Sequence, residues 1–298
     1  MASIDYRNGE ALKVSVTVIV PTLGLRPVFL LNALSSILNQ TLAPMEIIVV
    51  NNGLLKLGNL NLKNPLSVHI KVIDAVAKAG APQARNIGAA IAKGELLAFL
   101  DDDDLWGTTF LENALISISE NKADCCLGRI DKLEDSEISS FMDASTFLSV
   151  RSFLVMNPGA TGSNILIRKD VFRDIGGFDS SICPTEDRGL MVELLNRNYK
   201  VCVAPMSQAI MQMHDQERLT VSRTVNLGFR KFHHKYKHLM GFRDRIYSNW
   251  LFRNEEFKNR KTIVGRFVLF VMSALIFLIG RRPRRIWISP VPVSWSTL

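Results

Sequence analysis

Short apolar runs and helix-like patterns alternate along the first hundred residues of the chain. The runs are rich in β-branched side chains and predict strands, whereas apolar side chains at helical spacing predict helices between them. The predicted strands lie at 14–20, 46–50, 68–73 and 95–100, and the predicted helices lie at 27–39 and 82–93. Pro21 is expected to end the first strand, because proline cannot donate a hydrogen bond to a strand ladder. This order predicts an α/β fold with a Rossmann-like, mostly parallel sheet flanked by helices.

The second half of the chain has a less regular pattern. Strands are predicted at 124–129, 160–167, 200–204 and 209–213, and a helix at 186–197. From about residue 215 the sequence becomes helical and basic. We therefore expect a domain at 1–215 and a basic helical C-terminal region at 216–298.

Charge is distributed unevenly between these two parts. The chain has a net charge of +8, but residues 217–298 contain 17 Lys and Arg against 4 Asp and Glu, a net charge of +13, which leaves −5 for residues 1–216. Basic residues flank an apolar stretch at about 263–280, which favours an anionic membrane surface over nucleic acid as the partner. We expect a monotopic, membrane-associating anchor, while a membrane-spanning helix and a buried or oligomer helix remain alternatives.

The N-terminus and the cysteines indicate the compartment. Residues 1–13 contain Asp5, Arg7 and Glu10 and lack the apolar core of a signal peptide. The four cysteines form no C-x-x-C pair and are interpreted as reduced thiols. We expect a cytoplasmic protein at the inner face of the cytoplasmic membrane, whose oligomeric state the sequence does not indicate.

Four consecutive aspartates, Asp101 to Asp104, follow the predicted strand at 95–100. Adjacent carboxylates repel one another unless a cation neutralises them, and hard oxygen ligands suit Mg²⁺ or Mn²⁺. One interpretation is therefore a divalent cation that carries a phosphorylated ligand. The other is a solvated acidic turn that caps the next helix.

Other polar residues follow the predicted strands, namely Thr22, Asn51 and Asn52. These groups are expected to meet the aspartates in one crevice, because ligands of such sheets bind at the carboxyl ends of the strands. No G-x-G-x-x-G follows the first strand and no G-x-x-x-x-G-K-[ST] occurs in the sequence. A dinucleotide redox site and a P-loop are therefore unfavoured.

An ordered series of short motifs resembles the family 2 glycosyltransferases of the GT-A fold. The motifs, which cover roughly residues 14–214, are Val18-Ile19-Val20-Pro21-Thr22, Ser36-Ile37-Leu38-Asn39-Gln40, Glu46-Ile47-Ile48-Val49-Val50, Ala84-Arg85-Asn86-Ile87-Gly88, Ala98-Phe99-Leu100-Asp101-Asp102-Asp103-Asp104, Gly176-Gly177-Phe178-Asp179 and Thr185-Glu186-Asp187. The resemblance implies an inverting transfer of a sugar from a nucleotide-sugar donor to an acceptor.

The resemblance also implies a donor site. Asp101 and Asp103 correspond to the D-x-D element that holds the metal ion against the donor diphosphate, and Asp102 would reach the ribose. The other residues expected around the donor are Pro21, Thr22, Asn51 and Arg85. Arg85 would grip phosphate or orient Asp102, and its alternative is a surface ion pair with Glu95 or another acid.

Asp187 corresponds to the general base of the family, which takes the proton of the acceptor hydroxyl. Glu186 would orient its loop or contact the acceptor. Thr185, Glu186 and Asp187 are also placed to cap the helix at 186–197. His214 lies where related enzymes carry a histidine near the metal, although a solitary histidine at a strand end is also compatible with a structural role.

The sequence departs from the family pattern at two places. Asn51 stands where an aspartate usually accepts a hydrogen bond from the donor base, and an asparagine carbonyl still accepts one from uracil or thymine. Leu23-Gly24 replaces the usual tyrosine and asparagine after the first strand. We expect a UDP- or dTDP-linked donor and a saccharide or lipid-linked saccharide acceptor in surface polysaccharide biosynthesis. The alternatives are a metal-dependent nucleotidyltransferase, which would release pyrophosphate, and a non-catalytic module that binds membrane or nucleic acid.

Overall fold

The computed structural model describes residues 4–7, 10–12, 14–54, 56–57, 60, 62–64, 67–75, 80–142, 148–213, 225–246 and 248. All of them belong to one compact unit, residues 1–248. His214 and the predicted anchor at 263–280 lie outside the described residues. No helix in the described ranges has both the length and the apolar character that crossing a membrane requires.

The elements predicted before the middle of the chain are present with the expected type and order, among others that the sequence did not predict. The elements of this part are β1 (Ile4–Arg7), β2 (Glu10–Leu12), β3 (Val16–Thr22), α1 (Pro27–Leu38), β4 (Glu46–Asn51), β5 (His69–Asp74), α2 (Ala81–Ile91), β6 (Leu96–Phe99), β7 (Asp104–Trp106) and α3 (Phe110–Asn121). The short strands β1, β2 and β7 and the helix α3 were not predicted.

The later elements follow in the order β8 (Cys125–Glu134), β9 (Glu137–Met142), α4 (Val150–Val155), β10 (Ile165–Arg168), α5 (Lys169–Asp174), η1 (Ser180–Ile182), α6 (Glu186–Asn196), β11 (Val201–Gln212), α7 (Val225–Tyr236) and η3 (Lys237–Leu239). The two strands predicted at 200–204 and 209–213 form the single strand β11, whose pairing with β8 shifts between Ala204 and Gln208. Pro205 lies in this interruption and has no N–H for the ladder.

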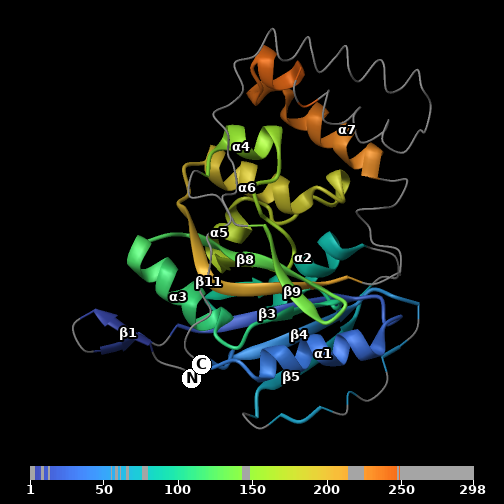
Figure 1. Cartoon of the computed structure of the whole chain (residues 1–298), viewed down its shortest axis with the longest axis vertical. Helices are drawn as coiled ribbons and strands as arrows, with labels where there is room; N and C mark the ends of the chain where they lie inside the picture. Colours follow the sequence, from blue (N-terminus) through green and yellow to red (C-terminus); the bar gives the residue numbers. More distant parts are fainter. Residues whose placement is uncertain are drawn as a thin grey trace. The chain divides into compact units, whose positions relative to one another are not determined.

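The main sheet of the described residues has the strand order β5-β4-β3-β6-β10-β8-β11-β7, with β9 paired to β8 (Figure 1). The strands β5, β4, β3 and β6 are parallel. Beyond them β10 runs antiparallel to both β6 and β8, and β7 runs antiparallel to β11. The strands β8 and β11 pair parallel again and share the direction of the first four. The sheet is therefore mixed but mostly parallel, as predicted, with β10, β7 and β9 as the antiparallel strands.

Pro21 does not end β3, contrary to the sequence prediction. The strand continues to Thr22, and Pro21 lies opposite Val50 of β4. The pairing of β3 with β6 ends at Ile19 and Phe99, two residues before the proline. At Pro21 the ladder with β6 has already ended, so no partner is lost when the N–H is missing.

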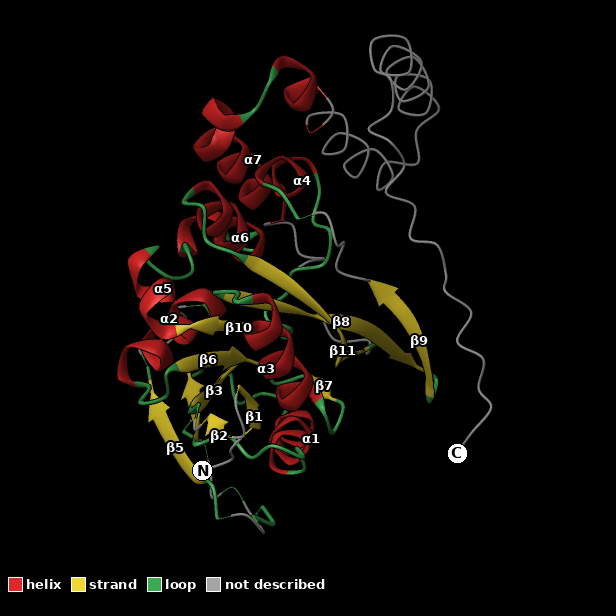
Figure 2. Ribbon diagram, turned by 90° about the vertical axis from the view of Figure 1, so that its left-hand side faces the viewer, coloured by secondary structure: helices red, strands yellow, loops and turns green. Residues whose placement is uncertain are grey.

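Both faces of the sheet are buried, which explains the apolar runs of its strands. Alternate residues of each strand point to opposite faces. Ile19, Ile48 and Phe99 contribute to a core that also includes residues of α2, α4, α5, α6 and α7. Val18, Val49 and Ala98 contribute to a second core with α1 and α3. Figure 2 shows the strands between these helices.

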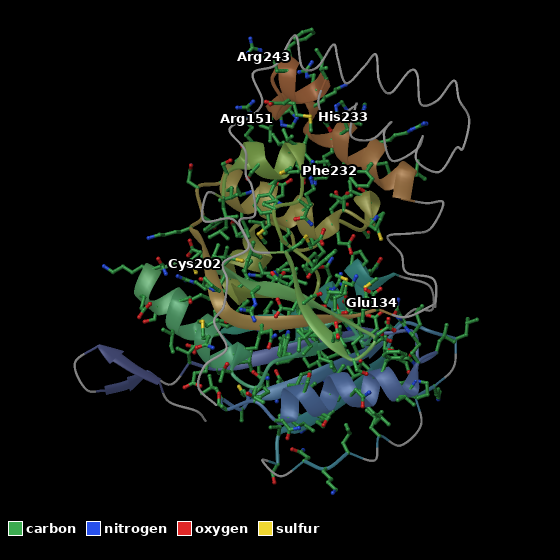
Figure 3. The ribbon with its side chains drawn as sticks, viewed as in Figure 1. Glu134, Arg151, Cys202, Phe232, His233 and Arg243 are labelled. Atoms are coloured by element: carbon green, nitrogen blue, oxygen red, sulfur yellow. The ribbon has the colours of Figure 1, made fainter. Side chains whose placement is uncertain are left out.

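Helix α7 packs on α6 at one end of the compact unit. Phe232 is fully buried there, and the Tyr236 hydroxyl donates to Glu193 over 3.0 Å. Lys235 forms ion pairs with Asp179 and Glu193. Figure 3 shows Phe232 of α7 and Arg151 of α4 at this end, away from Glu134 on the β8–β9 hairpin.

Candidate active site

The parallel strands bring their carboxyl ends to one edge of the sheet. Thr22 at the end of β3 is opposite Asn51 at the end of β4, and the backbone N–H of Leu100, just after β6, donates to the carbonyl of Ile19. The four aspartates therefore leave β6 beside Thr22. Of the polar groups predicted to meet, Thr22 contacts Asp102 directly. Asn51 and Asn52 stand at the neighbouring strand end, where the backbone N–H of Asn52 donates to the Thr22 carbonyl over 2.9 Å.

Asp102 and Asp103 are held by residues that follow β3. The Thr22 hydroxyl donates to Asp102 over 2.5 Å. The guanidinium of Arg26, just before α1, donates to Asp103 over 2.5 Å and to Asp102 over 3.0 Å. One arginine therefore neutralises two adjacent carboxylates of the cluster.

Asp101 pairs with Arg85 on α2. The guanidinium of Arg85 donates through Nη2 to Oδ1 of Asp101 and through Nη1 to Glu186 of α6 over 3.1 Å. Arg85 is buried, and its guanidinium carbon lies 5.3 Å from the centre of the Phe178 ring. It therefore joins the aspartates after β6 to the start of α6.

Gly162 makes room for this guanidinium. A Cβ atom at residue 162 would lie 2.1 Å from Nη2 of Arg85 and 3.0 Å from Oδ2 of Asp101. Real Cβ contacts this short do not occur, so only glycine fits without moving Arg85. The segment before β10 thus shapes the site as much as the strands that carry the aspartates.

Asp104 has a structural environment. It begins β7 and accepts a hydrogen bond from the Ser163 hydroxyl over 2.6 Å. The same hydroxyl accepts from the backbone N–H of Asp101 over 3.2 Å, and the Trp106 indole donates to the carbonyl of Ser163. These contacts fix the turn in which the aspartates lie.

The side chain of Asn51 is oriented by its neighbours. Its amide nitrogen donates to Asp74 of β5 over 2.8 Å, and its carbonyl accepts from the backbone N–H of Gly53 over 3.1 Å. One lone pair of that carbonyl is thereby engaged.

Asp187 lies in the first turn of α6 and is partly buried. Its carboxylate accepts from the backbone N–H of Arg188 over 2.6 Å. Burial, and then the negative charge of Glu186, raise the pKa of Asp187 to about 8, although the Arg188 N–H and the charge of Arg85 oppose the shift. A carboxyl group with such a pKa suits proton transfer near neutral pH.

Two further charges of the site are shifted by their surroundings. Burial raises the pKa of Asp102 to about 6, against the effects of Thr22 and Arg26. Burial lowers the pKa of Arg85, but Asp101 and Glu186 outweigh it, so the pKa is raised overall. Arg85 is therefore a permanent positive charge between the two acidic groups.

Several alternatives from the sequence are decided by these contacts. The aspartates do not cap a helix, because Asp104 begins β7 and α3 begins only at Phe110. Arg85 is not in a surface pair with Glu95, which instead accepts from Ser15. Thr185 precedes α6, but its hydroxyl donates to the carbonyl of Ile182 and makes no side-chain cap.

The described residues contain no preformed cluster of metal ligands. Within the described ranges, no three His, Cys, Asp or Glu side chains are arranged to hold a metal ion. Asp101 and Asp103 point their carboxylates at different arginines, Arg85 and Arg26. The assignment of Asp101, Asp103 and His214 as metal ligands stays a prediction.

The sequence reasoning missed Arg26, Ser163 and Gly162. Arg26 stands beside the proline that begins α1, and Gly162-Ser163 precedes β10. A basic residue in a strand-to-helix connection and a glycine-serine pair before a short strand are the available signals. Neither is specific without the strand order that brings them to Asp101–Asp104.

Comparison with known proteins places these features in a family. The model of glycosyl transferase family 2 matches residues 17–176, just over half of the chain. An uncharacterized glycosyltransferase of Haemophilus influenzae is 27% identical over 54% of this chain and 56% of its own length. Glycosyltransferase GlyG of Streptococcus pneumoniae is 28% identical over 41% of each chain. The chain thus spans about half, or less, of the length of these relatives.

A solved structure shares the fold. Residues 1–349 of S. aureus TarS, in complex with UDP-GlcNAc, match with a TM-score of 0.62 at 16% identity, over 87% of this chain and 79% of that one. The likeness covers the mixed sheet and its helices, and it supports the expected GT-A fold. From the family match together with this fold, we conclude that the chain belongs to glycosyl transferase family 2.

Proposed function

We propose that this protein is an inverting glycosyltransferase that moves a sugar from a nucleotide-sugar donor to an acceptor hydroxyl. One observation carries the proposal, namely the continuous contact from Asp101 through Arg85 to Glu186, the neighbour of Asp187. It links the carboxylates expected at the donor diphosphate to the carboxylate expected at the acceptor. The family match supports the same reaction class.

The donor is a UDP- or dTDP-linked sugar in this proposal. The Asn51 carbonyl accepts from the base N–H, and Asp102 accepts from the ribose. TarS, which shares the fold, was solved with UDP-GlcNAc. Asn51 and Asp102 contact the nucleotide in this proposal, so they do not determine which sugar is transferred.

The donor set fits a hard divalent cation, Mg²⁺ or Mn²⁺. Arg85 takes Oδ1 of Asp101, whereas Oδ2 receives no hydrogen bond from the described residues and the side chain is 32% exposed. Asp101 and Asp103 would hold the cation through carboxylate oxygens, with His214 as a further ligand. When bound, it supplies positive charge that stabilises the departing diphosphate. GalNAc-T7, another chain with this fold (TM-score 0.54, 17% identity, over 74% of this chain and 48% of that one), was solved with Mn²⁺.

Asp187 acts as the general base. It takes the proton of the acceptor hydroxyl while the hydroxyl oxygen bonds to the anomeric carbon. The bond from that carbon to the diphosphate oxygen breaks at the same time, and its electron pair leaves with the nucleoside diphosphate. Attack from the face opposite the leaving group inverts the anomeric centre.

The acceptor in this proposal is a saccharide or lipid-linked saccharide of surface polysaccharide biosynthesis, met at the inner face of the cytoplasmic membrane. WfgD of Escherichia coli, 27% identical over 36% of this chain and 42% of its own length, is named a glucosyltransferase acting on a diphosphoundecaprenol-linked sugar. The basic residues beyond 216 and the apolar segment at 263–280 would hold the protein at an anionic surface.

The test is a product assay with purified protein, Mn²⁺, a panel of UDP- and dTDP-sugars and lipid-linked acceptors. Release of nucleoside diphosphate with transfer of the sugar supports the proposal. Release of pyrophosphate would identify a nucleotidyltransferase instead. If no donor is consumed and lipid binding persists, the protein is a binding module and the proposed activity is wrong.

A further inference from the structure

Arg26 occupies the carboxylates that the proposed function assigns to cation and ribose. Its two terminal nitrogens divide between Asp103, at 2.5 Å, and Asp102, at 3.0 Å. The side chains are largely buried, with 19% of Arg26 and 13% of Asp103 exposed. A guanidinium in this fork arrangement is a strong partner for carboxylates, and equally for a diphosphate.

The two arginines of the site differ in the elements that supply their ion-pair partners. Arg85 is held by carboxylates from two separate elements, lies over the Phe178 ring and is closely covered by Gly162. Arg26 instead stands in the connection between β3 and α1, and it pairs with Asp102 and Asp103, two consecutive residues of one turn. Binding of a ligand at the turn of Asp102 and Asp103 therefore affects both ion pairs of Arg26 together.

A divalent cation on Asp103 and the Arg26 guanidinium compete for the same carboxylate. The oxygen that Arg26 contacts at 2.5 Å belongs to the carboxylate that the cation needs. Two positive groups on one carboxylate repel each other, and the repulsion is strong where solvent is largely excluded. Binding of a cation at Asp103 therefore weakens the attraction between this carboxylate and the guanidinium and favours release of Arg26.

We propose that Arg26 is a built-in counter-ion of the donor site, which exchanges from Asp103 to the donor diphosphate when a divalent cation and the nucleotide bind. The exchange keeps the acidic turn neutralised before the ligands arrive and adds a phosphate contact afterwards. This inference rests on the proposed function of the same site. In this inference, Arg26 weakens binding of the divalent cation and strengthens binding of the nucleotide.

The test measures binding without turnover in Arg26→Gln. Mn²⁺ affinity is measured from the free-ion electron paramagnetic resonance signal, and UDP affinity by calorimetry at saturating Mn²⁺. Removing the competing guanidinium should tighten binding of Mn²⁺ alone, and removing the phosphate contact should weaken binding of UDP, each by about tenfold, as expected for one charged hydrogen bond. Arg168→Gln is the matched control, because Arg168 pairs with Asp170 at the opposite end of the strands.

The opposite signs separate this exchange from a structural role. If Arg26 only stabilises the turn, both affinities fall together, and this result overturns the inference. Unchanged affinity for Mn²⁺ or for UDP overturns it as well. Arg26→Lys serves if the glutamine variant fails to fold, because lysine keeps the charge but lacks the fork. It should bind Mn²⁺ more tightly and UDP more weakly than the wild type, and unchanged affinities would overturn the inference.

Failure of the inference differs from failure of the proposed function. If wild-type protein and Arg26→Gln both bind no Mn²⁺, the inference is overturned together with the metal part of the function. If the wild type binds Mn²⁺ and transfers sugar while Arg26→Gln shows wild-type affinities, only the inference fails.

Discussion

At the scale of single residues, the proton on Asp187 controls the proposed reaction. Burial and the neighbouring Glu186 raise the pKa of this carboxyl group to about 8, so the group is mostly protonated at pH 7 in the free protein. A general base works only in its deprotonated form. The raised pKa therefore costs activity at neutral pH but provides a stronger base once the proton is lost.

The dependence of kcat/KM on pH follows from this pKa. Because kcat/KM reports the free enzyme, it should rise about tenfold per pH unit below about 8 and level off above it. Steady-state rates between pH 6 and 9.5 at fixed Mn²⁺ measure the profile. A flat profile in this range would contradict the assignment of Asp187.

Asp187→Asn should remove transfer and leave UDP binding nearly unchanged, because the amide keeps the shape but cannot take a proton. Rates come from the product assay and affinities from calorimetry. Asp103→Ala is the comparison and should weaken Mn²⁺-dependent UDP binding itself. A fully active asparagine variant would refute the role of the base.

The same substitution should change stability in a pH-dependent way. Between the unfolded pKa near 4 and the folded pKa of about 8, the native state binds the Asp187 proton more tightly than the unfolded state. Stability contributed by this group is thus present at low pH and is lost as pH rises through 8. Asp187→Asn should therefore raise the Tm more at pH 9 than at pH 5, which differential scanning fluorimetry measures.

Gly162→Ala should reduce transfer by moving Arg85. The added Cβ would meet Nη2 of Arg85 at 2.1 Å, and a displacement of about 1 Å near a reacting centre costs about 100-fold in rate. Gly241→Ala is the control, since its Cβ would make only an ordinary contact of 3.5 Å with Asp244. Equal rates for both variants would show that the position of Arg85 is not critical.

At the scale of elements, Arg188 fastens the helix that carries Asp187. Its buried guanidinium donates to the carbonyls of Phe153 and Leu154 at the end of α4 and lies 4.2 Å from the ring centre of Phe232 on α7. Burial lowers the pKa of Arg188 to about 10, although Asp187 opposes the shift, so the side chain stays charged at neutral pH. Three helices therefore meet at one side chain next to the proposed base.

Arg188→Met should destabilise the protein by about 3 kcal/mol, because two buried carbonyls lose their charged donor. The free energy of unfolding is measured by urea denaturation. Arg197→Met near the other end of α6 removes an exposed ion pair with Asp174 and should cost less than about 0.5 kcal/mol. If the two variants lose equal stability, Arg188 does not have this role.

The elements that the sequence predicted best are those whose signal is local. Strands buried on both faces contain continuous apolar runs, and these runs identify β3, β4 and β6, although Thr17 and Glu46 are buried polar exceptions. The short strand β7 begins with an aspartate and is recognisable only from its pairing with β11. Strand direction also depends on distant parts of the chain. β10 is antiparallel to β6 and β8, and its own sequence does not indicate that it lies between them.

The residues of the candidate site also differ in whether their signal in the sequence is local. Asp101–Asp104, Arg85 and Asp187 stand in recognisable motifs, and the structure brings their side chains together. Arg26 was missed because its partner Asp103 is 77 positions away, and the contact exists only through the adjacency of β3 and β6. Gly162 was missed because its role depends on the position of a guanidinium from α2.

At the scale of the whole molecule, the described C-terminal segment is strongly basic. Residues 225–246 contain six Lys and Arg against one Asp, and Phe242 is 76% exposed. Lys231, Lys237 and Arg243 are exposed cations of this segment. Such a combination of charge and apolar surface suits an anionic membrane.

Neutralising Lys231, Lys237 and Arg243 together should weaken binding to phosphatidylglycerol vesicles, by about 1 kcal/mol per charge at low salt. Cosedimentation at several salt concentrations measures the effect. Neutralising three exposed lysines elsewhere, Lys71, Lys93 and Lys122, provides the control. Equal vesicle binding by both triple variants would exclude this segment as the docking surface.

The ion pairs of Arg85 with Asp101 and Glu186 limit which parts of related proteins can be joined in a chimera. The two acidic partners lie 85 positions apart in the chain, on either side of β8, β9 and β10. A chimera that takes its nucleotide-binding half from one relative and its α6 from another must inherit this trio intact. Otherwise Arg85 or one of its acidic partners remains as a buried, uncompensated charge. The chimera should then fold poorly even if each parent protein folds well.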